Sequence, residues 1–228
     1  MCFNKETSLV VYIIGTLCYI YLFYRGFKEN RKNDISGAVL LLLIAQMQLV
    51  EYFLWKNQKC NYINLLLSIV IVILLYLQST MNYLTNIYFY GDKWRPNFKT
   101  RNYYILLLFT FLLFLMIYKM ITWKSMEDVC SLKSNNSCRL NWSFLTLSLK
   151  NFQFLILVFF FGLCYFYFFK IPYQNIKYNI ISRSFMTCMF LISLLYTLYI
   201  GGIDGIGIVG SIFCFLCAFW GIFLILKI

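Results

Sequence analysis

Glu51 is the one acidic residue of this chain that lies inside a long apolar block. An ionisable side chain in a bilayer core is costly and is by default a functional-site candidate. Gln48, Glu51 and Trp55 are spaced by three and four residues, so a helix places them on one face. We therefore predict a substrate pathway along this face. The alternative is a solvated carboxylate, because Glu51 lies about 24 Å along a helix from Ile35, near the edge of a core roughly 30 Å thick.

A second polar stripe follows further along the chain. Gln78, Asn82 and Asn86 recur every four residues, with Ser79 and Tyr83 beside them. A polar face of this kind suits a pathway or a contact between helices. Gln78 and Asn82 therefore join the pathway candidates. The alternative is that these residues form the solvated cytoplasmic end of a helix.

Cys130 and Cys138 lie in one polar connection. They are close enough in sequence to form a small disulfide loop if that connection faces an oxidising compartment. Cys60 is the alternative partner for either of them. The same connection contains two N-glycosylation sequons, which begin at Asn135 and Asn141. Both features predict that this connection lies on the outer or lumenal side of a membrane.

The residue inventory argues against catalysis. The chain has no histidine, no two carboxylates in one apolar block and no nucleophile beside a base. It also lacks a Gly-rich phosphate loop. We therefore expect no enzymatic activity, no metal site and no cofactor. The net charge of +12 lies in short connections rather than on a folded basic face, so we expect no nucleic-acid partner.

The elements that position these side chains are apolar helices. Hydrophobic residues make up 62% of the chain and charged residues 12%, against roughly 25% charged in a soluble domain. A span needs about 20 mostly apolar residues. Seven blocks qualify: 8–24, 35–55, 63–85, 103–122, 151–169, 184–200 and 207–226. The fold class is thus an all-α, seven-span membrane protein, and the first block is interpreted as a retained span rather than a removed signal.

Basic residues orient these spans. The connections after spans one, three and five, with the C-terminal tail, contain 12 of the 20 Lys and Arg residues. Cytoplasmic connections carry such an excess. We therefore predict a multi-pass protein with its N-terminus outside or lumenal and its C-terminus in the cytoplasm. The sequence does not specify which membrane.

The chain also repeats itself at a shift of 146 positions. Between residues 17–36 and 163–182, eight of the twenty aligned pairs are identical. The matching segments occupy equivalent points of the hydrophobic profile, which predicts two related helical bundles. The shift aligns Glu51 with Thr197, which completes the set of pathway candidates.

The two connections aligned by this repeat contain further motif residues. Pro172 and Gln174 follow the fifth span, and Gly26 aligns with Pro172 at the end of the first span. A basic stretch and a Ser follow in both connections. This pattern resembles the PQ-loop and SWEET-like families, in which a Pro-Gln pair closes the first helix of each three-helix unit. Here Tyr173 separates the two residues, so the dipeptide is not intact.

The resemblance implies a parallel 3+1+3 arrangement. The first three-helix unit would occupy 1–90, a linker helix with an outer loop 91–150, and the second unit 151–228. Gly26 and Pro172 would be hinges, although both residues also commonly end helices. The resemblance implies that Trp55 lines the solute cavity, whereas its position near an interface favours an aromatic belt.

The resulting expectation is a transporter that moves a small polar solute, a sugar or an amino acid, by alternating access between the two units. Its partners would be the lipid bilayer and the solute, and self-association into a homo-oligomer is left open. Two alternatives remain. A seven-helix receptor or sorting protein would not transport, and Cys60 paired with Cys130 or Cys138 would mimic the outer disulfide of G-protein-coupled receptors. The other alternative is an orphan membrane scaffold.

Overall fold

The computed structural model describes residues 4–90, 96–123, 125–133 and 140–144. Nearer the C-terminus it describes 188, 191–193, 195–196, 199, 212, 216, 221–222 and 224–226. The described chain is mostly helical. Every described residue from 188 onward has helical backbone.

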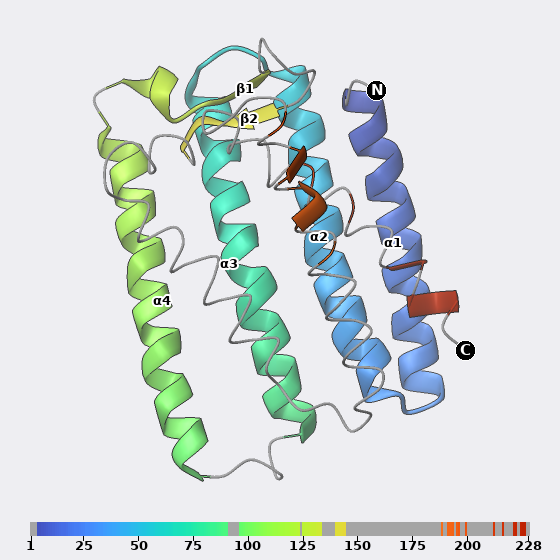
Figure 1. The fold of residues 1–228 in the computed structure, drawn as a ribbon. Helices are drawn as coiled ribbons and strands as arrows, with labels where there is room; N and C mark the ends of the chain where they lie inside the picture. The colour runs from blue at the N-terminus through green and yellow to red at the C-terminus, as the bar shows by residue number, and fades with distance from the viewer. Residues whose placement is uncertain are drawn as a thin grey trace.

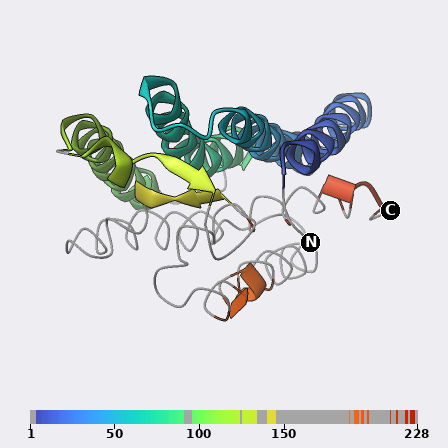
Figure 2. The ribbon, with the colours of Figure 1, turned by 90° about the horizontal axis from the view of Figure 1, so that it is seen from above.

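Four antiparallel helices form a row in chain order (Figure 1). They are α1 (Lys5–Lys28), α2 (Lys32–Lys56), α3 (Tyr62–Tyr90) and α4 (Pro96–Thr122). Each helix contacts the next one along the chain, as expected where short connections join antiparallel neighbours. Figure 2 shows the same row from above. The four predicted spans 8–24, 35–55, 63–85 and 103–122 are confirmed as helices, each lying within one of these elements.

The connection between α1 and α2 is a tight turn. Asn30 has φ 51°, a left-handed conformation that asparagine tolerates better than most residues. The Glu29 amide donates to the Arg25 carbonyl at 2.9 Å, and the Arg31 amide donates to the Gly26 carbonyl at 2.8 Å. This pattern satisfies the last carbonyls of α1. The chain therefore reverses within three residues and starts α2 beside the end of α1.

A small hairpin was not predicted. After α4 the chain forms a 3-10 turn, η2 (Met126–Asp128), and two short strands, β1 (Ser131–Lys133) and β2 (Leu140–Trp142). The strands pair antiparallel, with Ser131 opposite Trp142. We call residues 125–133 and 140–144 the cap. It lies at the end of the row where α1 starts and α2 ends (Figure 1), and the all-α expectation is wrong for this segment.

The core of the described part is centred on α2. Leu41, Met47 and Leu54 are completely buried, whereas α1 and α4, at the two edges of the row, expose large apolar side chains. Two described helices, α1 and α2, are long and apolar enough to cross a membrane. The apolar stretches found within α3 and α4 are shorter, Tyr62–Gln78 and Leu106–Thr122. The predicted fifth span and most of the unit 151–228 lie outside the described residues.

Candidate functional site

Gln48 and Glu51 form a buried polar pair on α2. The Gln48 Nε2 donates to Glu51 Oε2 at 3.1 Å. Gln48 is 0% exposed and Glu51 is 1% exposed. The alternative of a solvated Glu51 is therefore wrong, because the neighbouring helices cover this turn of α2. A buried carboxylate requires hydrogen-bonding partners to offset its desolvation, and Gln48 is one of them.

Gln78 extends this polar region from α3. Its Nε2 donates to the Met47 sulfur at 2.9 Å, and its side chain is buried. Met47 precedes Glu51 by four residues, so the two lie one turn apart on the same face of α2. Gln48, Glu51 and Gln78, which we call the polar cluster, are thus buried polar residues joined in two contacts, Gln48 to Glu51 within α2 and Gln78 of α3 to Met47 of α2.

The Nε2 groups of Gln48 and Gln78 donate to the partners named above. Within the described part of the chain, Oε1 of Gln48 and Oε1 of Gln78 are buried and make no hydrogen bond. A buried polar atom left in this state costs about 1–3 kcal/mol. The two carboxamide oxygens are acceptors. The cluster is therefore complementary to a ligand that donates hydrogen bonds, such as a hydroxyl or an amino group.

The remaining pathway candidates are placed less fully. Trp55 is partly buried and packs against the hydrophobic core, one turn beyond Glu51. Asn82 belongs to α3, but its side chain lies outside what the structure describes. Thr197 lies outside the described residues. The pathway role of Asn82 and Thr197 therefore stays a prediction.

Gly26 is a close-contact residue. A Cβ at this position would lie 2.6 Å from Ile35 Cγ1 and 3.1 Å from the Ile35 amide nitrogen. Only glycine lets the end of α1 approach the start of α2 this closely. Gly26 lies in the last turn of α1, two residues before the helix ends at Lys28. The hinge role remains a prediction, and its counterpart Pro172 lies outside the described residues.

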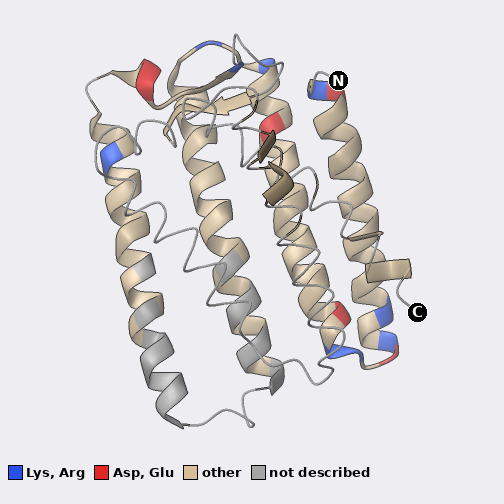
Figure 3. Cartoon of the chain, viewed as in Figure 1, with Lys and Arg blue, Asp and Glu red and all other residues tan. Residues whose placement is uncertain are grey.

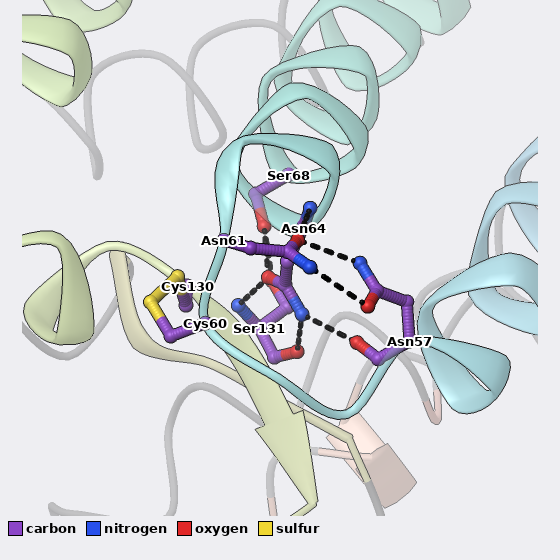
Figure 4. The surroundings of a disulfide bond; sticks show 7 residues. All are labelled: Asn57, Cys60, Asn61, Asn64, Ser68, Cys130 and Ser131. Atoms are coloured by element: carbon purple, nitrogen blue, oxygen red, sulfur yellow. Dashed lines mark hydrogen bonds between the residues drawn. A yellow bond between two sulfur atoms is a disulfide. The ribbon is translucent and has the colours of Figure 1, made fainter.

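The outer disulfide joins Cys60 to Cys130 (Figure 4). Their Cα atoms are 5.7 Å apart, within the usual range for a disulfide. The predicted loop between Cys130 and Cys138 is therefore wrong, and the named alternative partner Cys60 is the one used. The fold explains this result, because Cys60 lies two residues before α3 and the cap folds back over that end of the helix. Cys138 itself lies outside the described residues.

Asn64 links the start of α3 to the cap by buried hydrogen bonds. Its Nδ2 donates to the carbonyls of Asn57, at 2.9 Å, and Ser131, at 3.0 Å. Its Oδ1 accepts from the Ser131 amide at 2.8 Å. Ser68 and Ser131 share a further hydrogen bond between their hydroxyls at 2.8 Å. Figure 4 shows these side chains converging between α2, α3 and the cap. The junction is thus held by both a covalent bond and buried hydrogen bonds.

Of the glycosylation candidates, Asn141 is placed and Asn135 lies outside the described residues. Asn141 is in β2, opposite Leu132, and its residue is partly buried. Glycosylation at either position remains a prediction.

A buried ion pair lies at the end of the helical row opposite the cap and was not predicted from the sequence. Arg25 Nε lies 2.6 Å from Asp34 Oδ2, and both side chains are 9% exposed. Neither residue lies within a predicted span. A tight turn between antiparallel helices brings residues on its two sides into contact, so the positions of Arg25 and Asp34 on either side of a short connection were a usable signal. Apolar periodicity does not reveal such a pair. Figure 3 shows that charged residues of the described helices gather mainly at their ends.

Comparison with models of protein families, with curated proteins and with solved structures finds no match. The function must therefore be argued from the geometry of the polar cluster, the cap and the ion pair.

Proposed function

We propose that the helical row is embedded in a lipid bilayer. The most apolar window of α1 is only 28% buried, against 61% for α2, so α1 does not resemble an enclosed core helix. Its outward face exposes Leu17 and Phe27, and α4 exposes Phe114 and Ile121 in the same way. Such faces are unfavourable in water, whereas lipid tails cover them. The two ends of the helical row are mostly polar, which also supports its placement in a bilayer.

The orientation proposed from the basic residues has support from the cap. A disulfide persists on the oxidising side of a membrane, and the Cys60–Cys130 bond lies at the end of the row where α1 starts. The α1–α2 turn, which carries Lys28 and Lys32, lies at the other end. We therefore place the cap outside or in a lumen and this turn in the cytoplasm.

We infer that the protein is a seven-helix membrane receptor that recognises a small polar ligand. One observation carries this proposal: a disulfide joins the start of the third helix to the connection after the fourth. This linkage resembles the outer disulfide of G-protein-coupled receptors. The sequence lacks the acidic-Arg motif that such receptors carry in the third helix, so the proposal concerns ligand recognition and assigns no signalling partner.

The contacts of the first hairpin also favour a receptor over a duplicated transporter. In a duplicated bundle, residues that set the contact between two helices are expected in both copies. The 146-residue shift instead aligns Arg25 with Ile171 and Asp34 with Ile180. Two isoleucines cannot form an ion pair. The repeat therefore preserves apolar and aromatic positions but not the buried charges that fix the hairpin.

The polar cluster is the ligand contact that we propose. Its two carboxamide oxygens are buried acceptors, and Glu51 adds a carboxyl group that is bonded to Gln48. A ligand that donates hydrogen bonds would satisfy these atoms, and burial strengthens each such bond. Sugars and amino acids both carry suitable donors.

Transport by alternating access is the second candidate, and the same cluster favours it. A buried carboxylate with two carboxamides inside a membrane bundle is the kind of lining that a polar solute needs to cross. In this case the SWEET-like resemblance would hold, and Gly26 and Pro172 would act as hinges. An orphan scaffold is the third reading, and it requires that the cluster bind nothing.

Reconstituted full-length protein separates these functions. Its thermal stability would be measured with a panel of sugars, amino acids and small peptides, and each stabilising compound would then be tested for flux into proteoliposomes. Glu51→Gln removes the buried charge and should weaken binding at least about tenfold, as expected for a hydrogen bond to a charged group. Glu127→Gln, an exposed carboxylate in η2, is the matched control and should leave binding unchanged.

The outcomes are distinct. A receptor binds one or more compounds, is sensitive to Glu51→Gln and shows no flux above empty liposomes. Flux of a bound compound would overturn the receptor and support the transporter. If no compound of the panel stabilises the protein, both ligand-based functions fail and the scaffold is favoured.

A further inference from the structure

Arg25 contacts three parts of the chain at the cytoplasmic end proposed above. Its Nε bonds to Asp34 at the start of α2. Its two terminal nitrogens donate to backbone carbonyls, to Ile225 at 3.2 Å and to Leu224 at 3.1 Å. The guanidinium also lies 5.5 Å from the centre of the Tyr21 ring. One buried side chain thus connects α1, α2 and the C-terminal residues 221–226, which we call the C-terminal segment.

The geometry of a guanidinium suits this role. Its N–H groups form a rigid planar fork, so fixing one edge against a carboxylate also fixes the direction of the other donors. Asp34 therefore aims Arg25 at the two carbonyls. Because the pair is buried, solvent does not screen it as it screens an exposed pair.

Apolar contacts seat the C-terminal segment in the same place. A Cβ on Gly221 would lie 2.9 Å from Leu41 Cδ1 and 3.0 Å from Cys18 Cβ, so the backbone of this segment touches both α1 and α2. Leu224 is 2% exposed. The segment is therefore fitted between the two helices, one turn away from the carbonyls that Arg25 holds.

We propose that Arg25 and Asp34 form a latch that fastens the described residues of the C-terminal segment to the α1–α2 turn. The latch follows from the contacts alone and does not depend on whether the protein is a receptor or a transporter. Opening it frees the C-terminal segment while the cap, held by the disulfide, stays in place. The two ends of the bundle therefore differ in kind: one is locked covalently and the other by a reversible ion pair.

Hydrogen exchange of the full-length protein in nanodiscs tests the latch. In Arg25→Gln we expect amide exchange in a peptide covering 219–228 to rise at least about tenfold, since hydrogen bonds to a charged group are lost. A peptide covering the cap, 125–133, should not change. Arg25→Lys keeps the charge but not the planar fork, so it should also raise exchange in the C-terminal segment while preserving the fold.

Arg31→Gln is the matched control. Arg31 pairs with Glu29 at 2.6 Å in the same turn, but the side chains are 50% and 42% exposed. This variant removes the same charge without touching the C-terminal segment, so exchange there should stay as in the parent protein. If Arg31→Gln raises exchange as much as Arg25→Gln, net charge explains the effect and there is no latch. A rise spread equally over the cap and all helices in both Arg25 variants would likewise overturn the proposal.

Discussion

At the scale of single residues, the side chains that matter most are polar and buried. Glu51 and Asn64 both lie within helices that composition alone describes as apolar. Each is positioned by a contact to another element or turn, and each contact is specific in geometry. Exposed charges such as Glu127 contribute little by comparison. The chemical character of this chain therefore resides in a few enclosed polar atoms.

Asn64→Ala should lower the free energy of unfolding by about 2–3 kcal/mol. The substitution removes the carboxamide that bonds to Asn57 and Ser131 and leaves the buried Ser131 amide without its acceptor, which carries a desolvation penalty. Unfolding of the protein in detergent, followed by circular dichroism, measures the change.

Gln58→Ala is the control for this variant. Gln58 is only partly buried; it accepts from the Lys133 amide at 2.8 Å and donates to the Leu54 carbonyl at 2.7 Å, so water can replace these bonds and the loss should stay within about 1 kcal/mol. Equal losses for the two variants would show that burial of the Asn64 network contributes nothing.

At the scale of elements, the molecule is organised by pairs of neighbours. The α1–α2 pair is joined by a three-residue turn, the close approach at Gly26 and the Arg25–Asp34 ion pair. The α3–α4 pair is joined at its outer end by the cap, through Cys60 and Cys130. The two junctions lie at opposite ends of the row, so each pair of helices has one fixed end.

Removing the disulfide should reduce stability by about 3–5 kcal/mol. The bond closes a loop with a sequence separation of 70, and the chain-entropy estimate for loops of this size falls in that range. Cys60→Ser with Cys130→Ser should unfold at lower denaturant than the parent, and reductant should shift the parent but not the double variant.

The single variant Cys138→Ser distinguishes the two possible pairings. It should leave the link between Cys60 and Cys130 intact, because Cys130 is bonded to Cys60. A loss equal to that of the double variant would instead restore the pairing of Cys130 with Cys138. Peptide mapping under non-reducing conditions identifies the linked peptides directly.

At the scale of the whole molecule, the described half is a flat row with apolar edges and polar ends. Lipid would cover the exposed faces of α1 and α4, and the polar cluster would lie inside the bundle. The C-terminal segment packs against α1 and α2. The first helix and the C-terminal segment therefore lie side by side. A receptor and a transporter both require such an enclosed interior.

The orientation can be tested on the intact protein in cells. A tag ahead of Asn4 should be accessible to antibody without permeabilisation, whereas a tag after Ile228 should require it, because the proposed orientation puts the cap on the oxidising side and the basic α1–α2 turn in the cytoplasm. In a glycosylating host, Asn135→Gln with Asn141→Gln should abolish any mobility shift caused by an endoglycosidase. Staining of the C-terminal tag alone on intact cells would reverse the assigned orientation.

The sequence by itself determined the positions of the four described helices, whose ends lie up to seven residues beyond the predicted spans. Long apolar blocks have few alternatives to the helix, because backbone groups away from water must bond within the segment, and α1 to α4 each contain a predicted span. It also identified Gln48, Glu51 and Gln78 as polar residues in apolar surroundings, since composition alone shows that contrast.

Only the tertiary structure decided which residues meet. The bond of Cys60 to Cys130, the ion pair of Arg25 with Asp34 and the burial of Glu51 all join or cover residues from different elements. Such contacts depend on how helices reverse and pack, and a pattern along one helix does not encode them. For the same physical reason the hairpin of the cap was missed: its strands are three residues each, too short for a period to be recognised, and the disulfide and Asn64 hold them in place.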